Sequence, residues 1–148
     1  MKFDMHCHTK QGSIDAKIPI ERYIELLHEQ GFDGMLVTDH DSYKGYRYWQ
    51  TIKDKTPEGF VVLRGIEYDT KDAGHFLVIM PEDIELSVLQ IRGMSVEMLE
   101  EIVHHFGGIL GPAHPFGIRG SSAMFCNKVL KNPHLLNKFD FVEGFNTC

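Results

Sequence analysis

Two kinds of hydrophobic pattern alternate along this chain of 148 residues. Short apolar runs bounded by polar or turn residues predict strands at 2–9, 33–40, 60–68, 75–80, 108–114 and 139–146. Apolar residues that recur every three or four positions predict helices at 18–31, 42–55, 95–107 and 122–132. This alternation of strand and helix predicts an α/β domain with a mostly parallel sheet.

The predicted helix at 95–107 has clear sequence signals at both of its ends. Ser95 stands where an N-cap side chain is expected, and Gly107 stands where the chain must leave the helix. Between them runs one apolar stripe, made of Leu99, Ile102, Val103 and Phe106. We expect this stripe to face the core.

Residues of metal-ligand type stand at the carboxyl ends of four predicted strands. They are His6 and His8, then Asp39 and His40, then Glu67, and finally His114. In α/β sheets the carboxyl ends of parallel strands gather at one edge, which is where ligands bind. Imidazole and carboxylate groups that converge in this way predict a metal site.

The first strand places two histidines on alternate residues. Side chains at i and i+2 of a strand point to the same face, so His6 and His8 project together, and Asp4 is expected on that face too. Cys7 is expected on the opposite face. Asp4 is interpreted as a partner of a ligand or as a polar group of the interior.

A predicted hairpin brings a second pair of ligand types together. Glu67 and His75 are equidistant from Lys71, so a symmetric turn sets them opposite each other. Opposed residues have Cβ atoms about 4.5–5.5 Å apart. This distance suits two ligands of one cation, or a carboxylate that bridges two cations.

Composition narrows the class of protein further. A formal charge of −6 argues against a uniformly basic nucleic-acid surface. No apolar run reaches the roughly 18 residues of a membrane span, and no signal segment opens the chain, so we expect a cytoplasmic protein with no membrane partner. Cys7, Cys126 and Cys148 are odd in number and scattered, which favours reduced thiols.

The order of these motifs resembles that of a known family. The stretches are "HCH", "SIDA", "TDHD", "GIE", a histidine that opens the next strand, and "AHP". Together they are similar to the PHP family (polymerase and histidinol phosphatase) over essentially the whole chain. The resemblance implies a single PHP-like domain over 1–148, a distorted seven-stranded (β/α) barrel, two to three divalent metals and phosphoesterase activity.

The resemblance also assigns ligands position by position. The first metal takes His6, His8 and Glu67; the second takes Glu67, His75 and His114, with Glu67 bridging; the third takes Asp15 and His40. Asp15 is equally well read as a turn residue. Mixed histidine and carboxylate ligands suit Zn²⁺, Mn²⁺ or Fe²⁺ better than Mg²⁺ or Ca²⁺.

One family motif has no counterpart in these residues. A late D-x-H motif, which in the family supplies ligands to the first and third metals, does not follow "VEGFN". We therefore expect a barrel that is incomplete at its C-terminal side and leaves its first strand as an open edge. Either a second copy of the chain or a continuation of the natural protein is expected to cover that edge.

The predicted reaction is hydrolysis of a phosphate ester by metal-activated water. Its expected catalytic residues are Glu67, Asp39 as a residue that orients a ligand imidazole, and Arg119 as a bidentate phosphate clamp. Lys17 and Lys44 are weaker phosphate candidates. The expected substrate is a phosphorylated small molecule, a nucleotide or an oligonucleotide. Two alternatives stay open: a metal-binding module without turnover, and an amidohydrolase-type enzyme that cleaves C–N bonds.

The remaining histidines carry no predicted chemistry. Three of them lie near the C-terminal ends of helices, where a cation is mildly favoured: His28, His104 and His105. They are interpreted as structural or solvated. His134 follows a proline in a loop and is assigned no role.

Overall fold

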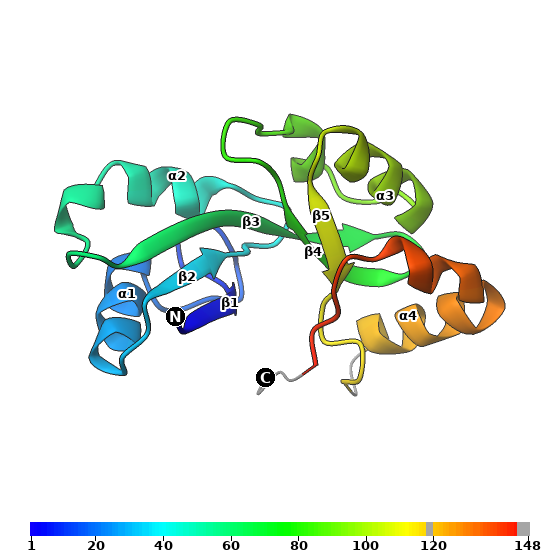
Figure 1. Cartoon of the computed structure of the whole chain (residues 1–148), viewed down its shortest axis with the longest axis horizontal. Helices are drawn as coiled ribbons and strands as arrows, with labels where there is room; N and C mark the ends of the chain where they lie inside the picture. The colour runs from blue at the N-terminus through cyan, green and yellow to red at the C-terminus, as the bar shows by residue number, and fades with distance from the viewer. Residues whose placement is uncertain (118–119, 145–148) are drawn as a thin grey trace. The chain divides into compact units, whose positions relative to one another are not determined.

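The computed structural model describes residues 1–117 and 120–144 (Figure 1). The chain divides into two compact units, Met1–Ile66 and Glu67–Cys148. Five strands are hydrogen-bonded in the order β1-β2-β3-β4-β5, and β3 runs from the first unit into the second. The predicted α/β class is confirmed.

The first unit is a parallel sheet with helices between its strands. Its strands are β1 (Phe3–Cys7), β2 (Gly34–Val37) and the first part of β3 (Val61–Thr70). Its helices are α1 (Ile20–Glu29), α2 (Lys44–Gln50) and the 3-10 turn η1 (Lys53–Lys55). β1 pairs with β2 and β2 with β3, both in parallel, as predicted.

The core of the first unit lies between α1 and one face of the sheet. The apolar stripe of α1 is buried at Ile20, Ile24 and Leu27, which pack with Cys7 and Met35 of the strands. This burial supplies most of the stability of α1, because an isolated helix of ten residues is only marginally stable in water.

Asp4 does not share a face with the histidines, contrary to the prediction. The pairing of β1 with β2 is irregular between Asp4 and Cys7, and Asp4 stands opposite Met35, a residue of the α1 core. The Asp4 carboxylate accepts hydrogen bonds from the Tyr23 hydroxyl of α1 at 3.2 Å and from the backbone N–H of His6 at 3.2 Å. An irregularity of one residue reverses the side-chain alternation, so strand period alone misplaces Asp4.

The second unit is built on antiparallel pairing. It holds the end of β3, β4 (Gly74–Ile79), β5 (Ile109–Pro112), α3 (Val96–His105), α4 (Gly120–Lys131), and the 3-10 turns η2 (Ser87–Gln90) and η3 (Pro133–Lys138). β4 and β5 are antiparallel, with Phe76 opposite Pro112. The tight turn at 71–73 is the predicted hairpin, and the antiparallel pairing of β4 with β5 makes the sheet less parallel than predicted.

The ends of α3 follow the sequence signals closely. The Ser95 hydroxyl accepts the backbone N–H of Met98, and Gly107 has a φ of +74°, where glycine is favoured. Leu99 and Val103 are fully buried. Phe106, expected in the stripe, is 42% exposed, because it follows the last helical residue and has left the buried face.

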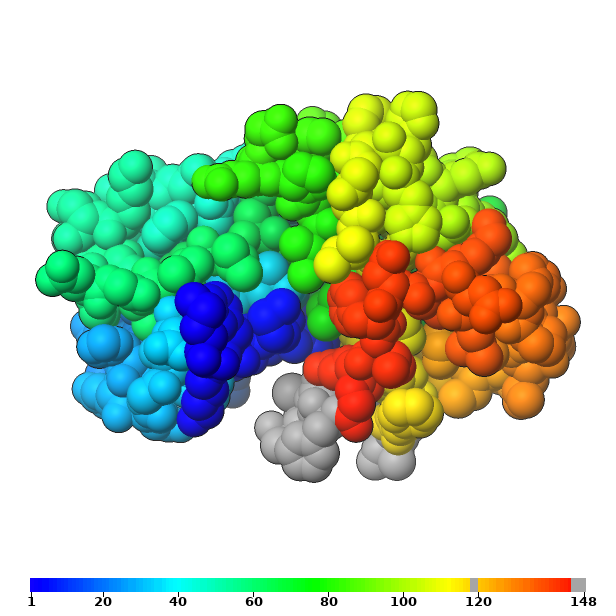
Figure 2. All heavy atoms as spheres, viewed as in Figure 1, coloured from blue at the N-terminus to red at the C-terminus, as the bar shows by residue number. Residues whose placement is uncertain are grey.

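The sixth predicted strand, 139–146, is not a regular strand in its described part, 139–144. It still runs beside β5: the N–H of Asp140 donates to the carbonyl of Leu110 at 2.9 Å, and that of Glu143 to Pro112 at 3.4 Å. Gly111 permits this approach, since a Cβ there would lie 2.3 Å from the carbonyl oxygen of Phe141. Figure 2 shows the segment, in red, on the surface of the second unit.

Two further predictions concern membranes and thiols. Within the described ranges, no helix combines the length and the apolarity that a membrane crossing requires. Cys7 and Cys126 are free thiols, the first buried and the second exposed. Cys148 lies outside the described residues.

Candidate metal sites

A buried carboxylate with two imidazoles forms the first cluster, in the second unit. Glu67 of β3 is fully buried, and its Oε1 lies 3.0 Å from Nδ1 of His75 on β4 and 2.9 Å from Nε2 of His114 after β5. Two atoms that bind one metal at about 2.0–2.1 Å lie roughly 2.9–3.4 Å apart. Each of these two distances fits a pair of ligands of one cation. The predicted contact of Glu67 with His75 is confirmed, although the turn at 71–73 is centred on Asp72 and not on Lys71.

The far side of each imidazole in this cluster faces a protein oxygen. Nε2 of His75 lies 3.6 Å from Oδ1 of Asp69, and Nδ1 of His114 lies 3.5 Å from the Ser121 hydroxyl. Metal-binding histidines commonly have their second nitrogen held by such an oxygen, which fixes the tautomer and the ring orientation.

Asp69 and Ser121 are absent from the sequence prediction. Asp69 could have been found, because it stands two residues after Glu67 on the same strand and so on the same face. Ser121 belongs to α4, and its approach to His114 depends on tertiary packing that the sequence does not signal.

The backbone at His114 is unusual. Its φ is 34°, in the left-handed region that residues other than glycine seldom adopt. Three contacts hold it there: the Ser122 hydroxyl donates to the His114 carbonyl at 2.6 Å, the N–H of Gly117 donates to the same oxygen at 3.0 Å, and the His114 N–H donates to the Glu143 carboxylate. Such conformations cluster at functional sites, where the surrounding structure must support them.

The second cluster belongs to the first unit. His8, Asp15 and His40 each offer a ligand atom, and these atoms all lie within 4.8 Å of one another. Nε2 of His40 is 3.5 Å from the Asp15 carboxylate. The rings of His8 and His40 stack at 4.5 Å, and the ring of His6 meets His8 edge-on at 5.0 Å. The predicted pair Asp15 and His40 is thus brought together, joined by His8.

Asp39 holds the residues next to this cluster through hydrogen bonds. It is fully buried and accepts hydrogen bonds from the backbone N–H and hydroxyl of Thr9, at 2.6 and 2.8 Å, and from the Ser13 hydroxyl at 3.1 Å. Burial raises the pKa of Asp39 above its usual value, and these hydrogen bonds from Thr9 and Ser13 oppose that rise.

Ser13 connects Asp39 to the two histidines of this cluster. Its hydroxyl accepts the backbone N–H of His40 at 2.9 Å and lies 3.4 Å from Nδ1 of His8. Because the single hydroxyl proton goes to Asp39, a hydrogen bond with His8 requires that Nδ1 of His8 carries the proton. Nε2 of His8 then has the lone pair that a metal needs.

The structure does not test the remaining predicted site residues. Arg119 lies outside the described residues. Lys17 and Lys44 are exposed side chains, which leaves their proposed role a prediction. The predicted first-metal set has His6 and His8 in the first unit and Glu67 in the second, and it too stays a prediction.

Comparison with known proteins adds a family and a fold. A family model described as "PHP domain" matches residues 4–130. The DNA polymerase III PolC-type of Lacticaseibacillus paracasei is 30% identical over 73 residues, which are 49% of this chain and 5% of that protein. The crystal structure of PsfC from Pseudomonas syringae PB-5123 matches with a TM-score of 0.56 and 19% identity, over 78% of this chain and 57% of that one. This last match shows a shared fold, and both relatives extend well beyond the matched region.

Proposed function

Because the chain belongs to the PHP domain family, we propose that it is a metal-dependent phosphoesterase and that its strands are part of a PHP-type barrel. The observation that carries the proposal is the Oε1 atom of Glu67, buried and contacted by two imidazoles. The match over residues 4–130 includes all the candidate ligands of both clusters. Phosphoesterase activity is the chemistry that the family resemblance implies.

The donor atoms fit divalent transition metals. One cluster would use Glu67, His75 and His114, and the other would use His8, Asp15 and His40. Imidazole nitrogen mixed with carboxylate oxygen suits Zn²⁺, Mn²⁺ or Fe²⁺. When bound, such a metal lowers the pKa of water and polarises a phosphoryl oxygen.

The chain itself places oxygen atoms near the outer nitrogens of the ligand imidazoles. Asp69 and Ser121 face the outer nitrogens of the two imidazoles around Glu67, and Ser13 does the same for His8. If these oxygens close to hydrogen-bond distance when a metal binds, they would select the tautomer and ring orientation of each imidazole.

Cys7, the thiol that lies between two candidate ligands, is poorly suited to act as a nucleophile. Cys7, although it lies between His6 and His8, is buried in the α1 core, and this burial raises the pKa of its thiol well above the usual value. A thiol that remains protonated is a poor nucleophile. Attack by water on phosphorus is therefore the reaction we propose, on a phosphorylated small molecule, a nucleotide or an oligonucleotide. No polymerase activity follows from the PolC-type match, which covers 5% of that protein.

The experiment is hydrolysis of p-nitrophenyl phosphate by the full chain with added Mn²⁺. We expect turnover that EDTA abolishes and that His75→Ala lowers at least about 100-fold, since a ligand is lost. His134→Ala, an exposed histidine of η3, is the matched control and should retain full rate. Equal turnover with and without EDTA, or none with Mn²⁺, Zn²⁺ or Fe²⁺, contradicts the proposal.

A further inference from the structure

A loop in the second unit is fastened to β3 beside the Glu67 cluster. It is residues 91–94, between η2 and α3 (Figure 1). The hydroxyl of Tyr68 donates to the carbonyl of Ile91 at 2.6 Å and accepts the N–H of Met94 at 3.0 Å. The N–H of Gly93 donates to the carbonyl of Asp69 at 3.1 Å. Tyr68 is fully buried, so these bonds form a fixed anchor rather than a surface contact.

The anchored loop presents one cation. Gly93 has a φ of +102°, a conformation that L side chains rarely adopt, so the shape of the loop next to Arg92 depends on this glycine. Nη1 of Arg92 lies 3.6 Å from Oδ2 of Asp69, and the other oxygen of Asp69 lies 3.6 Å from Nε2 of His75. A single carboxylate therefore separates the guanidinium of Arg92 from an imidazole of the candidate metal cluster.

The ion pair between Arg92 and Asp69 is loose. Its 3.6 Å separation exceeds the usual hydrogen-bond range, and the side chain of Arg92 is 65% exposed. An exposed ion pair of this kind contributes little to stability. The anchored backbone places an exposed guanidinium beside the Glu67 cluster, where it can receive an anion.

We propose that Arg92 is the phosphate-binding residue of this site and that it selects phosphate monoesters, an inference that rests on the proposed phosphoesterase function. The planar guanidinium can hold two oxygens of one phosphoryl group at once. To do so it must exchange Asp69 for the substrate. A monoester carries about −1.5 to −2 charges at pH 7 and competes with a carboxylate better than a diester, which carries only one.

The test measures binding of inorganic phosphate to the Mn²⁺-loaded full chain by calorimetry. We expect Arg92→Ala to weaken phosphate binding at least about tenfold with unchanged metal content, and Arg92→Lys to lie between it and the wild type, because lysine keeps the charge but lacks the fork. Arg22→Ala removes another exposed, ion-paired arginine, on α1, and should leave phosphate affinity unchanged. Methyl phosphate should bind at least about tenfold more tightly than dimethyl phosphate.

Several outcomes overturn the inference. They are an Arg92→Ala affinity within twofold of wild type, equal affinity for the monoester and the diester, and no phosphate binding by the wild type. These outcomes are separate from the failure of the proposed function. If the aryl phosphate is hydrolysed but Arg92→Ala keeps its phosphate affinity and KM, only the role of Arg92 falls. If phosphate binds through Arg92 but no ester is hydrolysed, only the enzymatic proposal falls.

Discussion

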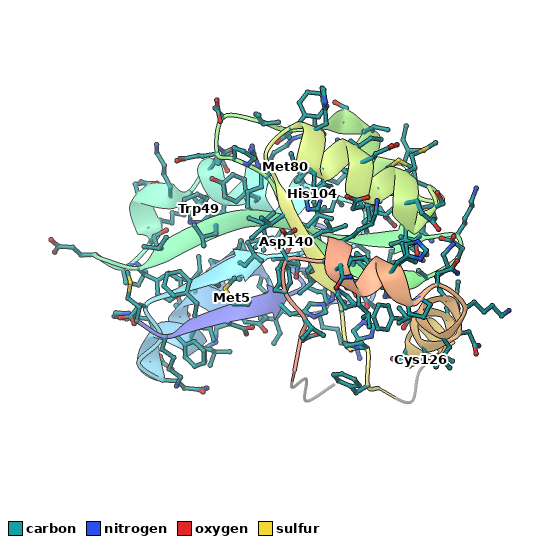
Figure 3. All side chains as sticks on the ribbon, turned by 45° about the vertical axis from the view of Figure 1, so that its right-hand side comes forward. Met5, Trp49, Met80, His104, Cys126 and Asp140 are labelled. Atoms are coloured by element: carbon teal, nitrogen blue, oxygen red, sulfur yellow. The ribbon has the colours of Figure 1, made fainter. Side chains whose placement is uncertain are left out.

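Asp140→Ala should destabilise the protein in a pH-dependent way, because Asp140 pairs with a histidine. His104 of α3 lies between two carboxylates: its Nε2 is 2.8 Å from Asp140, which Figure 3 labels beside it, and its Nδ1 is 2.9 Å from Glu100. The same Asp140 oxygen accepts the backbone N–H of Leu110 on β5 at 2.9 Å. This network holds the segment 139–144 against β5.

The pKa shifts give the sign of the pH dependence. The hydrogen bond with Asp140 raises the pKa of His104 above 6.5, so its contribution is complete below that pH and is lost as pH rises through the folded-state pKa. Burial pushes the pKa of Asp140 up, but hydrogen bonds from His104 and Leu110 hold it below 3.8. Its contribution is therefore present above that pH and is lost as pH falls through the lowered pKa. The pair stabilises most between these two values.

The size of the effect follows from the bonds removed. At pH 5.5, Asp140→Ala removes a charge-assisted hydrogen bond, taken at the low end of about 1.5–3 kcal/mol because a third of each side chain is exposed. It also removes a neutral hydrogen bond from Leu110, worth about 1 kcal/mol. We expect a loss of about 2–3 kcal/mol at pH 5.5. At pH 9 the loss should be smaller, because less of His104 is charged there, and it should approach the contribution of about 1 kcal/mol from Leu110.

Urea unfolding followed by circular dichroism at both pH values measures this difference. Glu25→Ala is the matched control, since Glu25 forms a more exposed ion pair with Arg22 and its loss should cost less than about 0.5 kcal/mol. If Asp140→Ala costs the same at pH 5.5 and pH 9, the charge on His104 does not contribute and the reasoning is wrong.

Two other substitutions test the two clusters. Glu67→Gln should lose more bound metal than His8→Ala in elemental analysis, because two imidazoles share the carboxylate of Glu67 and the resemblance makes it a bridge; equal losses would remove the shared role. Gly45→Ala should destabilise by roughly 2–4 kcal/mol in urea unfolding, because its Cβ would lie 2.1 Å from the buried Asp39 carboxylate. Gly120→Ala, with nothing within 4 Å of the added carbon, should change stability by less than about 1 kcal/mol, and a similar loss at both glycines would contradict the packing argument.

Local signals in the sequence were sufficient for much of the fold. The N-cap at Ser95 and the stop at Gly107 locate α3, because capping depends on a few neighbouring residues. The contact of Glu67 with His75 could be predicted because a tight hairpin brings residues of its two strands close together. These features need no knowledge of distant parts of the chain.

Features that depend on tertiary contacts were not predictable. Asp4 changes face because β1 pairs irregularly with β2, and nothing in its own strand marks that irregularity. The segment 139–144 reads as a strand, yet its bonds to β5 are unevenly spaced. Ser13 and Ser121 meet the ligand histidines from a loop and from α4, through contacts that sequence spacing does not encode.

The metal content of the purified protein tests the central claim most directly. Protein prepared without chelator and analysed for metals should contain roughly one to two equivalents of Zn, Mn or Fe per chain, through the clusters at Glu67 and His8. His75→Ala together with His114→Ala should lower that content, since both imidazoles contact the Glu67 carboxylate. A wild-type content below about a tenth of an equivalent, not restored by soaking with these metals, would contradict the assignment of both clusters as metal sites.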